Sequence, residues 1–364
     1  METALKITDR SLRAPSGVGA FIIAGPCSAE TESQVVQSAV ELAKLGRIHA
    51  LRAGIWKPRT RPNTFEGIGS VGLEWLKSAK AATGLPVAVE VANVKHVYEA
   101  LRTGVDILWI GARTTTNPFS VQEIAEALRG VSVPVLVKNP VNPDLELWVG
   151  ALERLNHAGV TTLGAVHRGF SSHERTRFRN NPLWTLPLEL KRRHPQLPLL
   201  CDPSHICGSR ELLAQVSQKA MDLNFDGLMI ESHADPDAAL SDRDQQLRPS
   251  ELGELLEKLV FRHSAMQDAA HQTKLEMLRA SIDRMDDELL ELLAQRMRVS
   301  EEIGRCKLEE NVSIFQPVRW DEIVKSRVRA GMEKNLAPDF LQKLLEIIHQ
   351  ESIDHQARVM RTAP

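Results

Sequence analysis

Side chains that can bind a divalent metal follow short apolar runs of this sequence. His205 comes just after the run Leu199-Leu-Cys and its Asp-Pro break, and Glu231 ends the next apolar run. Asp242 lies eleven positions after Glu231, and Cys27 follows an apolar run near the N-terminus. This mixed set of sulfur, nitrogen and oxygen donors suits a first-row divalent ion such as Mn, Fe, Co or Zn, whereas a thiolate argues against a pure Mg site. The sequence therefore predicts one metal centre, held by these four residues.

Basic residues follow other apolar runs in the same part of the chain, and Glu90 ends one of these runs. A single cation in such a place is usually a solvated charge. Several cations at one face would repel each other, and an anionic ligand offsets that cost most readily. We therefore expect substrates that carry phosphate and carboxylate groups. The residues concerned are Arg52, Lys57, Arg59, Arg113, Lys138 and Arg168.

Eight short β-rich runs alternate with helix-length amphipathic segments between residue 20 and about residue 232. This alternation, without hairpin signals, predicts a (β/α)8 barrel with parallel strands, and a doubly wound sheet is the alternative. In a barrel all eight strand ends face one mouth, which would gather the metal-binding and basic residues. The runs begin at Phe21, Ala50, Val87, Ile107, Val135, Thr162, Leu199 and Leu228.

The strand signal stops after about residue 262, and the rest of the chain has a helical pattern. Apolar residues recur from Leu275 to Ile303 at helical spacing, and Thr273-x-x-Glu276 predicts a capped helix start. The pattern exceeds the usual helix length, so we expect this helix to pack against another chain and form at least a dimer. Residues 311 to 317 break the pattern, a second helix runs to about residue 335, and Pro338 opens a third.

Two cations lie on the apolar stripe of that long helix. Arg296 and Lys307 are 11 positions apart, so they are about 20° out of phase and roughly 16 Å apart along the helix axis. Two inward cations at that spacing could bracket a small dianion. Arg279 lies 17 positions before Arg296, roughly 25 Å away, so any pocket that it serves together with such a pair must belong to a partner protomer.

Length and composition narrow the class of protein. The 364 residues suit a large barrel and a smaller domain, which we expect at 1–262 and 273–364 with a linker at 263–272. The formal charge of -2 argues against bulk nucleic-acid binding, and no apolar segment is long enough to span a membrane. Four cysteines are too few for a disulfide framework, and the N-terminus has no signal-peptide pattern. We therefore expect a cytoplasmic protein.

Five motifs at the expected strand ends are specific in combination: Ala24-Gly-Pro-Cys27-Ser, Leu51-Arg52 with Lys57-Pro-Arg59-Thr60, Ile110-Gly-Ala-Arg113, Asp202-Pro-Ser-His205, and Ile230-Glu231 with Ser241-Asp242. Together they resemble the type I 3-deoxy-D-arabino-heptulosonate 7-phosphate (DAHP) synthases, nearer their β subgroup. The resemblance covers about residues 20 to 260.

The resemblance implies a metal-dependent condensation of phosphoenolpyruvate with erythrose 4-phosphate, which gives DAHP and phosphate. It implies that the metal and Lys57 polarise the aldehyde, with Cys27, His205, Glu231 and Asp242 as metal ligands. It also implies that phosphoenolpyruvate is held by Arg52, Lys57, Arg113, Lys138 and Arg168. Arg59 and Thr60 would bind the phosphate side of erythrose 4-phosphate, and we expect Glu90 in the same substrate site.

Two departures from the family pattern leave the aldose phosphate open. Arg61 stands where the family usually has Ser, and Pro140 stands where Gly is usual. A reaction with another aldose phosphate, as in 3-deoxy-manno-octulosonate 8-phosphate synthase, is therefore an alternative, although Pro58 and Arg59 favour the heptulosonate enzyme. An alternative from a different class is a metal-free aldolase in which Lys138 forms a Schiff base.

The helical region contains a second group of motifs: Arg279, Asp283, Leu289-Leu-x-Leu-Leu-Ala-x-Arg296, Ile303-Gly-x-x-Lys307, Pro317-x-Arg319 and Glu351-Ser352-x-x-x-Gln356. They resemble the all-α chorismate mutases over about residues 270 to 360. The resemblance implies an intertwined helical dimer in which Arg296, Lys307 and Arg279 of the partner subunit bind the carboxylates of chorismate. Lys307 and Gln356 would flank the ether oxygen, and Arg319 and Ser352 would contribute to substrate binding.

Gln316 and Trp320 stand where this family usually places Asp and Glu, toward the ring hydroxyl of the substrate. Two interpretations of the helical region follow: a working mutase, or a regulatory ligand-binding module with weak turnover. In either case prephenate or chorismate could regulate the barrel. The two resemblances together imply a bifunctional enzyme of the shikimate pathway of aromatic amino acid biosynthesis.

Overall fold

The computed structural model describes residues 5–7, 11–14, 19–57, 65–173, 176–262 and 268–362. Arg59, Thr60 and Arg61, which the sequence analysis singled out, lie outside the described residues. The chain divides into two compact units, Met1–Ser264 and Ala265–Pro364. Each unit is described by itself below.

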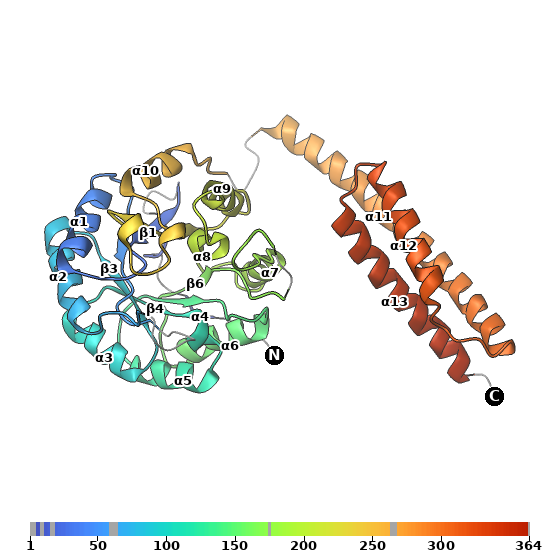
Figure 1. Ribbon diagram of the computed structural model, residues 1–364, viewed down its shortest axis with the longest axis horizontal. Helices are drawn as coiled ribbons and strands as arrows, with labels where there is room; N and C mark the ends of the chain where they lie inside the picture. Colours follow the sequence, from blue (N-terminus) through green and yellow to red (C-terminus); the bar gives the residue numbers. More distant parts are fainter. Residues whose placement is uncertain are drawn as a thin grey trace. The chain divides into compact units, whose positions relative to one another are not determined.

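The first unit is a closed barrel of eight parallel strands in sequence order, which confirms the predicted (β/α)8 architecture and excludes the open doubly wound sheet (Figure 1). Each expected run coincides with a strand to within one residue at its start. The strands are β1 (Phe21–Gly25), β2 (Ala50–Arg52), β3 (Val87–Val91), β4 (Ile107–Ile110), β5 (Val135–Lys138), β6 (Leu163–His167), β7 (Leu199–Cys201) and β8 (Gly227–Glu231).

Helices follow the strands, and the longer ones form an outer ring around the barrel (Figure 1). The helices of this unit are α1 (Glu32–Ala43), α2 (Val71–Thr83), α3 (Val94–Thr103), α4 (Ala112–Thr115), α5 (Pro118–Ala127), α6 (Leu145–His157), α7 (Thr185–Arg193), α8 (Pro203–Cys207), α9 (Leu213–Asp222) and α10 (Pro249–Lys258). The short helices α4 and α8 directly follow the ends of β4 and β7. Two 3-10 turns, η1 (Pro236–Ala238) and η2 (Arg243–Gln245), lie between β8 and α10.

The strands are apolar because both of their faces are buried. Alternate residues point outward against the helices or inward into the barrel, and these two sets form separate hydrophobic clusters. The inner cluster contains Phe21, Trp109, Leu136 and Met229, and Leu12 from the N-terminal segment joins it. Trp109 is fully buried. The barrel is therefore a packed core, and its chemistry is confined to the carboxyl ends of the strands.

The second unit contains three helices, α11 (Ala269–Glu309), α12 (Pro317–Met332) and α13 (Pro338–Thr362). This confirms the expected three-helix pattern and its break. The predicted helix start was wrong, because Asp268 caps α11 through the backbone amides of Ala270 and His271, and Thr273 lies inside the helix. The residues between Asp268 and Thr273 can adopt a helix, and the Asp268 side chain, which caps the helix N-terminus, determines that α11 begins there.

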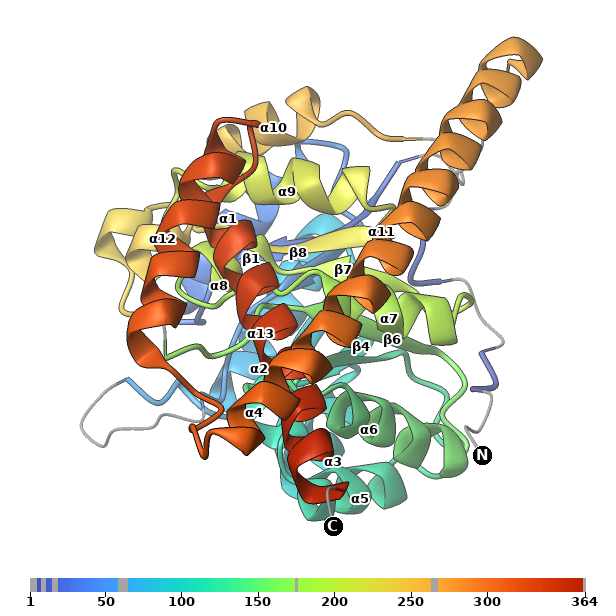
Figure 2. The ribbon, with the colours of Figure 1, turned by 90° about the vertical axis from the view of Figure 1, so that its right-hand side faces the viewer.

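The first turns of α11 extend past α12 and α13 in both views (Figures 1 and 2). The N-terminal half of α11 carries a row of apolar side chains that are exposed in the single chain; they include Met277, Leu278, Ile282, Met285 and Leu289. Exposed apolar side chains in such a row need a further covering surface. Among the described residues, no helix is both long enough and apolar enough to cross a membrane.

Candidate active sites

The carboxyl ends of the barrel strands gather the predicted site residues. Arg52 is the last residue of β2, Lys138 of β5 and Glu231 of β8. Because all the strands are parallel, these ends lie at the same rim of the barrel. The β7 strand is followed at once by Asp202 and by the short helix α8, which carries His205.

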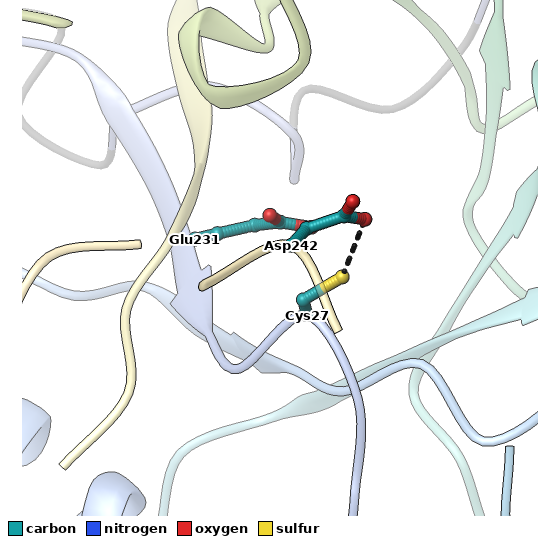
Figure 3. Close-up of side chains that lie close together, drawn as sticks. All are labelled: Cys27, Glu231 and Asp242. Atoms are coloured by element: carbon teal, nitrogen blue, oxygen red, sulfur yellow. Dashed lines mark hydrogen bonds between the residues drawn. The ribbon is translucent and has the colours of Figure 1, made fainter. Parts of the chain in front are cut away.

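Cys27, Glu231 and Asp242 form a compact cluster at this rim (Figure 3). One donor atom from each lies within 4.8 Å of the others, and the Cys27 thiol donates to Asp242 Oδ2 at 3.2 Å. Lys57 Nζ lies 2.7 Å from Cys27 Sγ and donates to it. Burial, together with the charge of Glu231, raises the pKa of the Cys27 thiol to about 12. A bound cation would reverse this preference, since a thiolate is the form that ligates metal.

His205, the fourth predicted ligand, is not part of this compact cluster and lies beside it, next to Glu231. Its Nε2 lies 3.9 Å from Glu231 Oε1. Its Nδ1 lies 3.0 Å from Asp202 Oδ1, and its backbone amide donates to the same oxygen. A carboxylate on Nδ1 orients the ring and leaves Nε2 available, which is the usual arrangement of a metal-binding histidine. In the described part of the chain, Glu231 Oε1 is buried and has no hydrogen-bond donor. The residues present therefore fit a first-row divalent ion.

Two buried glutamines that the sequence analysis missed hold this cluster. Gln245 and Gln246 follow Asp242 by three and four positions. The Gln245 amide donates to Glu231 Oε2 at 2.6 Å, and the Gln246 side-chain oxygen accepts from the Cys27 backbone amide at 2.8 Å. Both side chains are almost fully buried. The predicted ligands are thus oriented by a second layer of hydrogen bonds.

Arg179 is a further residue that the sequence analysis did not single out. It donates to Asp242 Oδ1 at 2.9 Å and to Gln245 at 2.7 Å. Although burial acts in the opposite direction, Arg179 and His205 hold the pKa of Asp242 well below its usual range. Asp242 has a left-handed backbone with φ of 48°, which turns its side chain toward these partners.

Arg52 is a buried cation of the site, only 3% exposed. One amino group donates to the Cys27 carbonyl at 3.3 Å and lies 3.3 Å from Glu231, and the guanidinium lies 5.1 Å from the centre of the Trp109 ring. Its Nε and Nη1 are buried without a hydrogen-bond partner among the residues that the structure describes. Buried donors without partners are costly, so this guanidinium is suited to an anion that enters the barrel mouth.

Lys138 also lies near Trp109, with its ammonium 5.8 Å from the ring centre. It forms a buried ion pair with Asp202 at 2.6 Å. Although burial acts in the opposite direction, His205 and Lys138 hold the pKa of Asp202 well below its usual range. An ammonium paired in this way has no free lone pair for attack on a carbonyl, which argues against the Schiff-base alternative.

Arg168 and Arg113 extend the basic surface of the mouth. Arg168 follows β6 and donates to Asn180 at 2.7 Å, and burial lowers its pKa to about 10. Arg113, in α4, is exposed. Glu90 accepts a hydrogen bond from the Trp109 indole at 3.1 Å. A Cβ at Gly111 would lie 2.0 Å from the Glu90 carboxylate, so a larger residue at this position would displace the Glu90 side chain.

A second group of predicted residues meets between α11 and α13. The Arg296 guanidinium donates to Ser352, and Lys307 donates to the Ile314 carbonyl at 2.6 Å. Burial lowers the pKa of both Arg296 and Lys307. Gln356 is 7% exposed, and its side-chain oxygen has no hydrogen-bond partner within the described chain. Two partly desolvated cations and a free amide oxygen therefore line one inter-helical site.

Three other predicted residues are exposed in the single chain. Arg279 is exposed on the same continuous helix as Arg296, about 25 Å away by helix geometry. Gln316 is exposed, and Arg319 is exposed and paired with Glu322 at 3.1 Å. Because α11 is one continuous helix, Arg279 cannot reach the Arg296 site of its own chain.

Comparison with known proteins matches the two units to two families. A model of the DAHP synthetase I family matches residues 7–268, and a model of chorismate mutase type II matches residues 278–357. A phospho-2-dehydro-3-deoxyheptonate aldolase of Thermotoga maritima is 33% identical over 254 residues, which are 70% of this chain and 72% of that protein. A 2-dehydro-3-deoxyphosphooctonate aldolase of Desulfotalea psychrophila is 28% identical over 271 residues, covering 70% and 93% of the two chains.

Solved structures give the same match. The crystal structure of the Thermotoga maritima DAHP synthase has a TM-score of 0.60 at 32% identity and covers 66% of this chain and 68% of that one. A truncated form of the Thermotoga enzyme has a TM-score of 0.57 at 29% identity, covering 66% and 84% of the two chains.

Proposed function

The chain belongs to the DAHP synthetase I family and carries a chorismate mutase type II domain, and from this we propose a bifunctional enzyme with its two sites at the places described above. The barrel, proposed at residues 1–262, condenses phosphoenolpyruvate with erythrose 4-phosphate. The helical domain, proposed at residues 273–364, converts chorismate to prephenate. The observation that carries the barrel assignment is the buried Arg52 guanidinium, with unused donors beside the Cys27, Glu231 and Asp242 cluster.

In the proposed barrel reaction, Arg52, Lys138 and Arg168 hold the phosphate and carboxylate of phosphoenolpyruvate. Cys27, His205, Glu231 and Asp242 would hold a divalent metal, which supplies Lewis acidity at the aldehyde. The enol carbon bonds to the aldehyde carbon, water adds to the neighbouring enol carbon, and phosphate leaves. The Lys57 ammonium, held at the cluster by Cys27, stabilises the negative charge that develops on the aldehyde oxygen.

Removal of the metal should abolish this reaction reversibly. Protein treated with a chelator is expected to consume no phosphoenolpyruvate, and added Mn should restore consumption with erythrose 4-phosphate. The measurement is the loss of enol absorbance over time, with the chorismate reaction of the same sample as the control, since that site has no metal ligands. Consumption that is unaffected by a chelator, in protein shown to be metal-free, would contradict the proposal.

The same assay decides a second candidate substrate. The octulosonate relative and the departures at Arg61 and Pro140 favour a test of arabinose 5-phosphate. Consumption with arabinose 5-phosphate alone would assign the barrel to the octulosonate reaction. Consumption with neither sugar, despite bound metal, would contradict both assignments.

In the proposed mutase site, Arg296 and Lys307 bind the carboxylates of chorismate, and Lys307 and Gln356 flank the ether oxygen. The pericyclic reaction needs no acid or base, only a held conformation and charge stabilisation away from water. We place the dimer interface on the exposed apolar row of α11, because covering that row would also bring Arg279 of the partner subunit to the site.

We also propose that prephenate, the mutase product, inhibits the barrel through the helical domain. Coupling of this kind requires that the ligand favour one of two states of the whole protein. Saturating prephenate is expected to slow phosphoenolpyruvate consumption by the wild-type chain and to have no effect on a Lys307→Met variant, which has lost its binding cation. Equal rates with and without prephenate in the wild-type chain would refute this regulation.

A further inference from the structure

His349 of α13 is a polar residue of the helical domain that the proposed mechanism does not use. Its ring stacks on Trp320, with 4.0 Å between the ring centres and 12° between the planes. Phe315 lies 6.0 Å away on a second side. The His349 Nε2 is buried, and the described residues provide it with no hydrogen-bond partner. The imidazole is therefore held in place by packing, with one nitrogen left unused.

The position of His349 on α13 places its unpartnered nitrogen at the proposed mutase site. His349, Ser352 and Gln356 are at positions i, i+3 and i+7 of α13, so they share one face. Ser352 contacts Arg296, and Gln356 packs against Gly304 of α11, where a Cβ would lie 3.1 Å from it. The face of α13 that carries His349 is thus the face turned to Arg296 and Lys307.

The charges around His349 favour its neutral form. The pKa of His349 is lowered mainly by burial, and the positive charges of Arg296 and Lys307 lower it further. Glu301 and Glu351 are paired with His355, six positions along α13 on another face. A neutral imidazole has one nitrogen that donates and one that accepts a hydrogen bond.

Three groups near His349 cannot accept a hydrogen bond from a hydroxyl. Arginine, lysine and the tryptophan indole only donate, so Arg296, Lys307 and Trp320 can serve carboxylates and the ether oxygen alone. Of the two acceptors on the same face, the Ser352 hydroxyl is already engaged with Arg296 and the Ile348 carbonyl, and the proposed mechanism assigns the Gln356 amide to the ether oxygen. Trp320 also stands where the related mutases usually place a carboxylate toward the ring hydroxyl. We propose that His349 Nε2 accepts a hydrogen bond from the ring hydroxyl of chorismate, with Trp320 as the surface that orients the imidazole. This inference rests on the proposed mutase function.

Two substitutions separate the hydrogen bond from the packing. His349→Phe keeps a ring on Trp320 and removes both nitrogens, whereas His349→Gln restores an acceptor. A lost hydrogen bond of roughly 1.4 kcal/mol corresponds to about a tenfold change, so His349→Phe is expected to lower kcat/KM for chorismate about tenfold and His349→Gln to recover most of it. The exposed neighbour Gln350→Ala is the control and should match the wild type. Unchanged barrel turnover and thermal melting would show that each variant is folded.

A chorismate analogue without the ring hydroxyl identifies the contact. Wild type and His349→Phe are expected to convert the analogue with equal kcat/KM. The inference is overturned if His349→Phe keeps the wild-type value with chorismate, if glutamine restores nothing, or if the variant loses the same factor with the analogue.

A binding measurement that needs no turnover tests the role of His349 separately from the proposed mutase activity. If the wild-type chain converts no chorismate, the mutase assignment fails, and a titration with prephenate, which retains the hydroxyl, then tests His349 alone. Binding about tenfold weaker in His349→Phe than in the wild type would support the contact. Equal binding, or no binding to either protein, would overturn it.

Discussion

A Lys57→Met variant is expected to lose about 1,000-fold in kcat/KM for phosphoenolpyruvate condensation, because one preorganised donor aimed at a developing oxyanion contributes up to this much. Lys57 lies 2.7 Å from Cys27, at the edge of the Cys27, Glu231 and Asp242 cluster, so in the proposed reaction its ammonium is beside the aldehyde oxygen. Methionine is unbranched and only one heavy atom shorter than lysine, and it carries no charge. The measurement is steady-state condensation at saturating metal, with chorismate turnover in the same sample expected at the wild-type rate.

Lys77→Met is the matched control for Lys57, because Lys77 is exposed on α2 and pairs only weakly with Glu74 at 3.8 Å. A Co²⁺ titration of the Lys57→Met variant separates catalysis from metal binding. We expect the cobalt affinity to stay close to that of the wild type. A rate loss of less than tenfold, or a rate loss fully explained by lost metal, would show that Lys57 does not stabilise the reacting oxygen.

A Lys307→Met variant is expected to lose about 1,000-fold in chorismate turnover while the barrel reaction is unchanged. The ammonium is partly desolvated between α11 and the segment before α12, where it donates to the Ile314 carbonyl. In the proposed site it faces both a carboxylate and the ether oxygen of the breaking bond, so its charge acts most strongly in the transition state. The measurement is the disappearance of chorismate absorbance.

The control for Lys307 lies on the same helix. Arg305 is exposed, two positions before Lys307, and pairs with Glu301 at 3.9 Å. Arg305→Met should therefore keep wild-type turnover. If Lys307→Met and Arg305→Met had the same small effect, the helical domain would have to use a different cation.

The barrel could be predicted from the sequence because parallel strands buried on both faces must be short apolar runs, and their ends must meet. That logic located Arg52, Lys138 and Glu231 at the observed strand ends. It could not find Gln245 or Gln246, since a buried amide is recognised only by its partners. Those partners depend on η2 and on the left-handed backbone of Asp242. Neither feature can be predicted from the spacing of apolar residues in the sequence.

The helical domain shows a different limit of prediction. Its three helices follow from apolar spacing and from the break before Pro317, yet the start of α11 was misplaced because Asp268 caps it. His349 was missed for a related reason. One histidine on a charged helix resembles any solvated residue, and only the stacked Trp320 ring and the unpartnered nitrogen distinguish it.

Trp109 makes the barrel mouth optically observable. Its indole is fully buried, lies close to the charged groups of both Arg52 (5.1 Å) and Lys138 (5.8 Å), and donates a hydrogen bond to Glu90. The emission of an indole depends on the electric field across its ring, and an anion that neutralises two adjacent cations changes that field. Arrival of phosphoenolpyruvate should therefore be recorded by the protein's own fluorescence, without a label and without turnover.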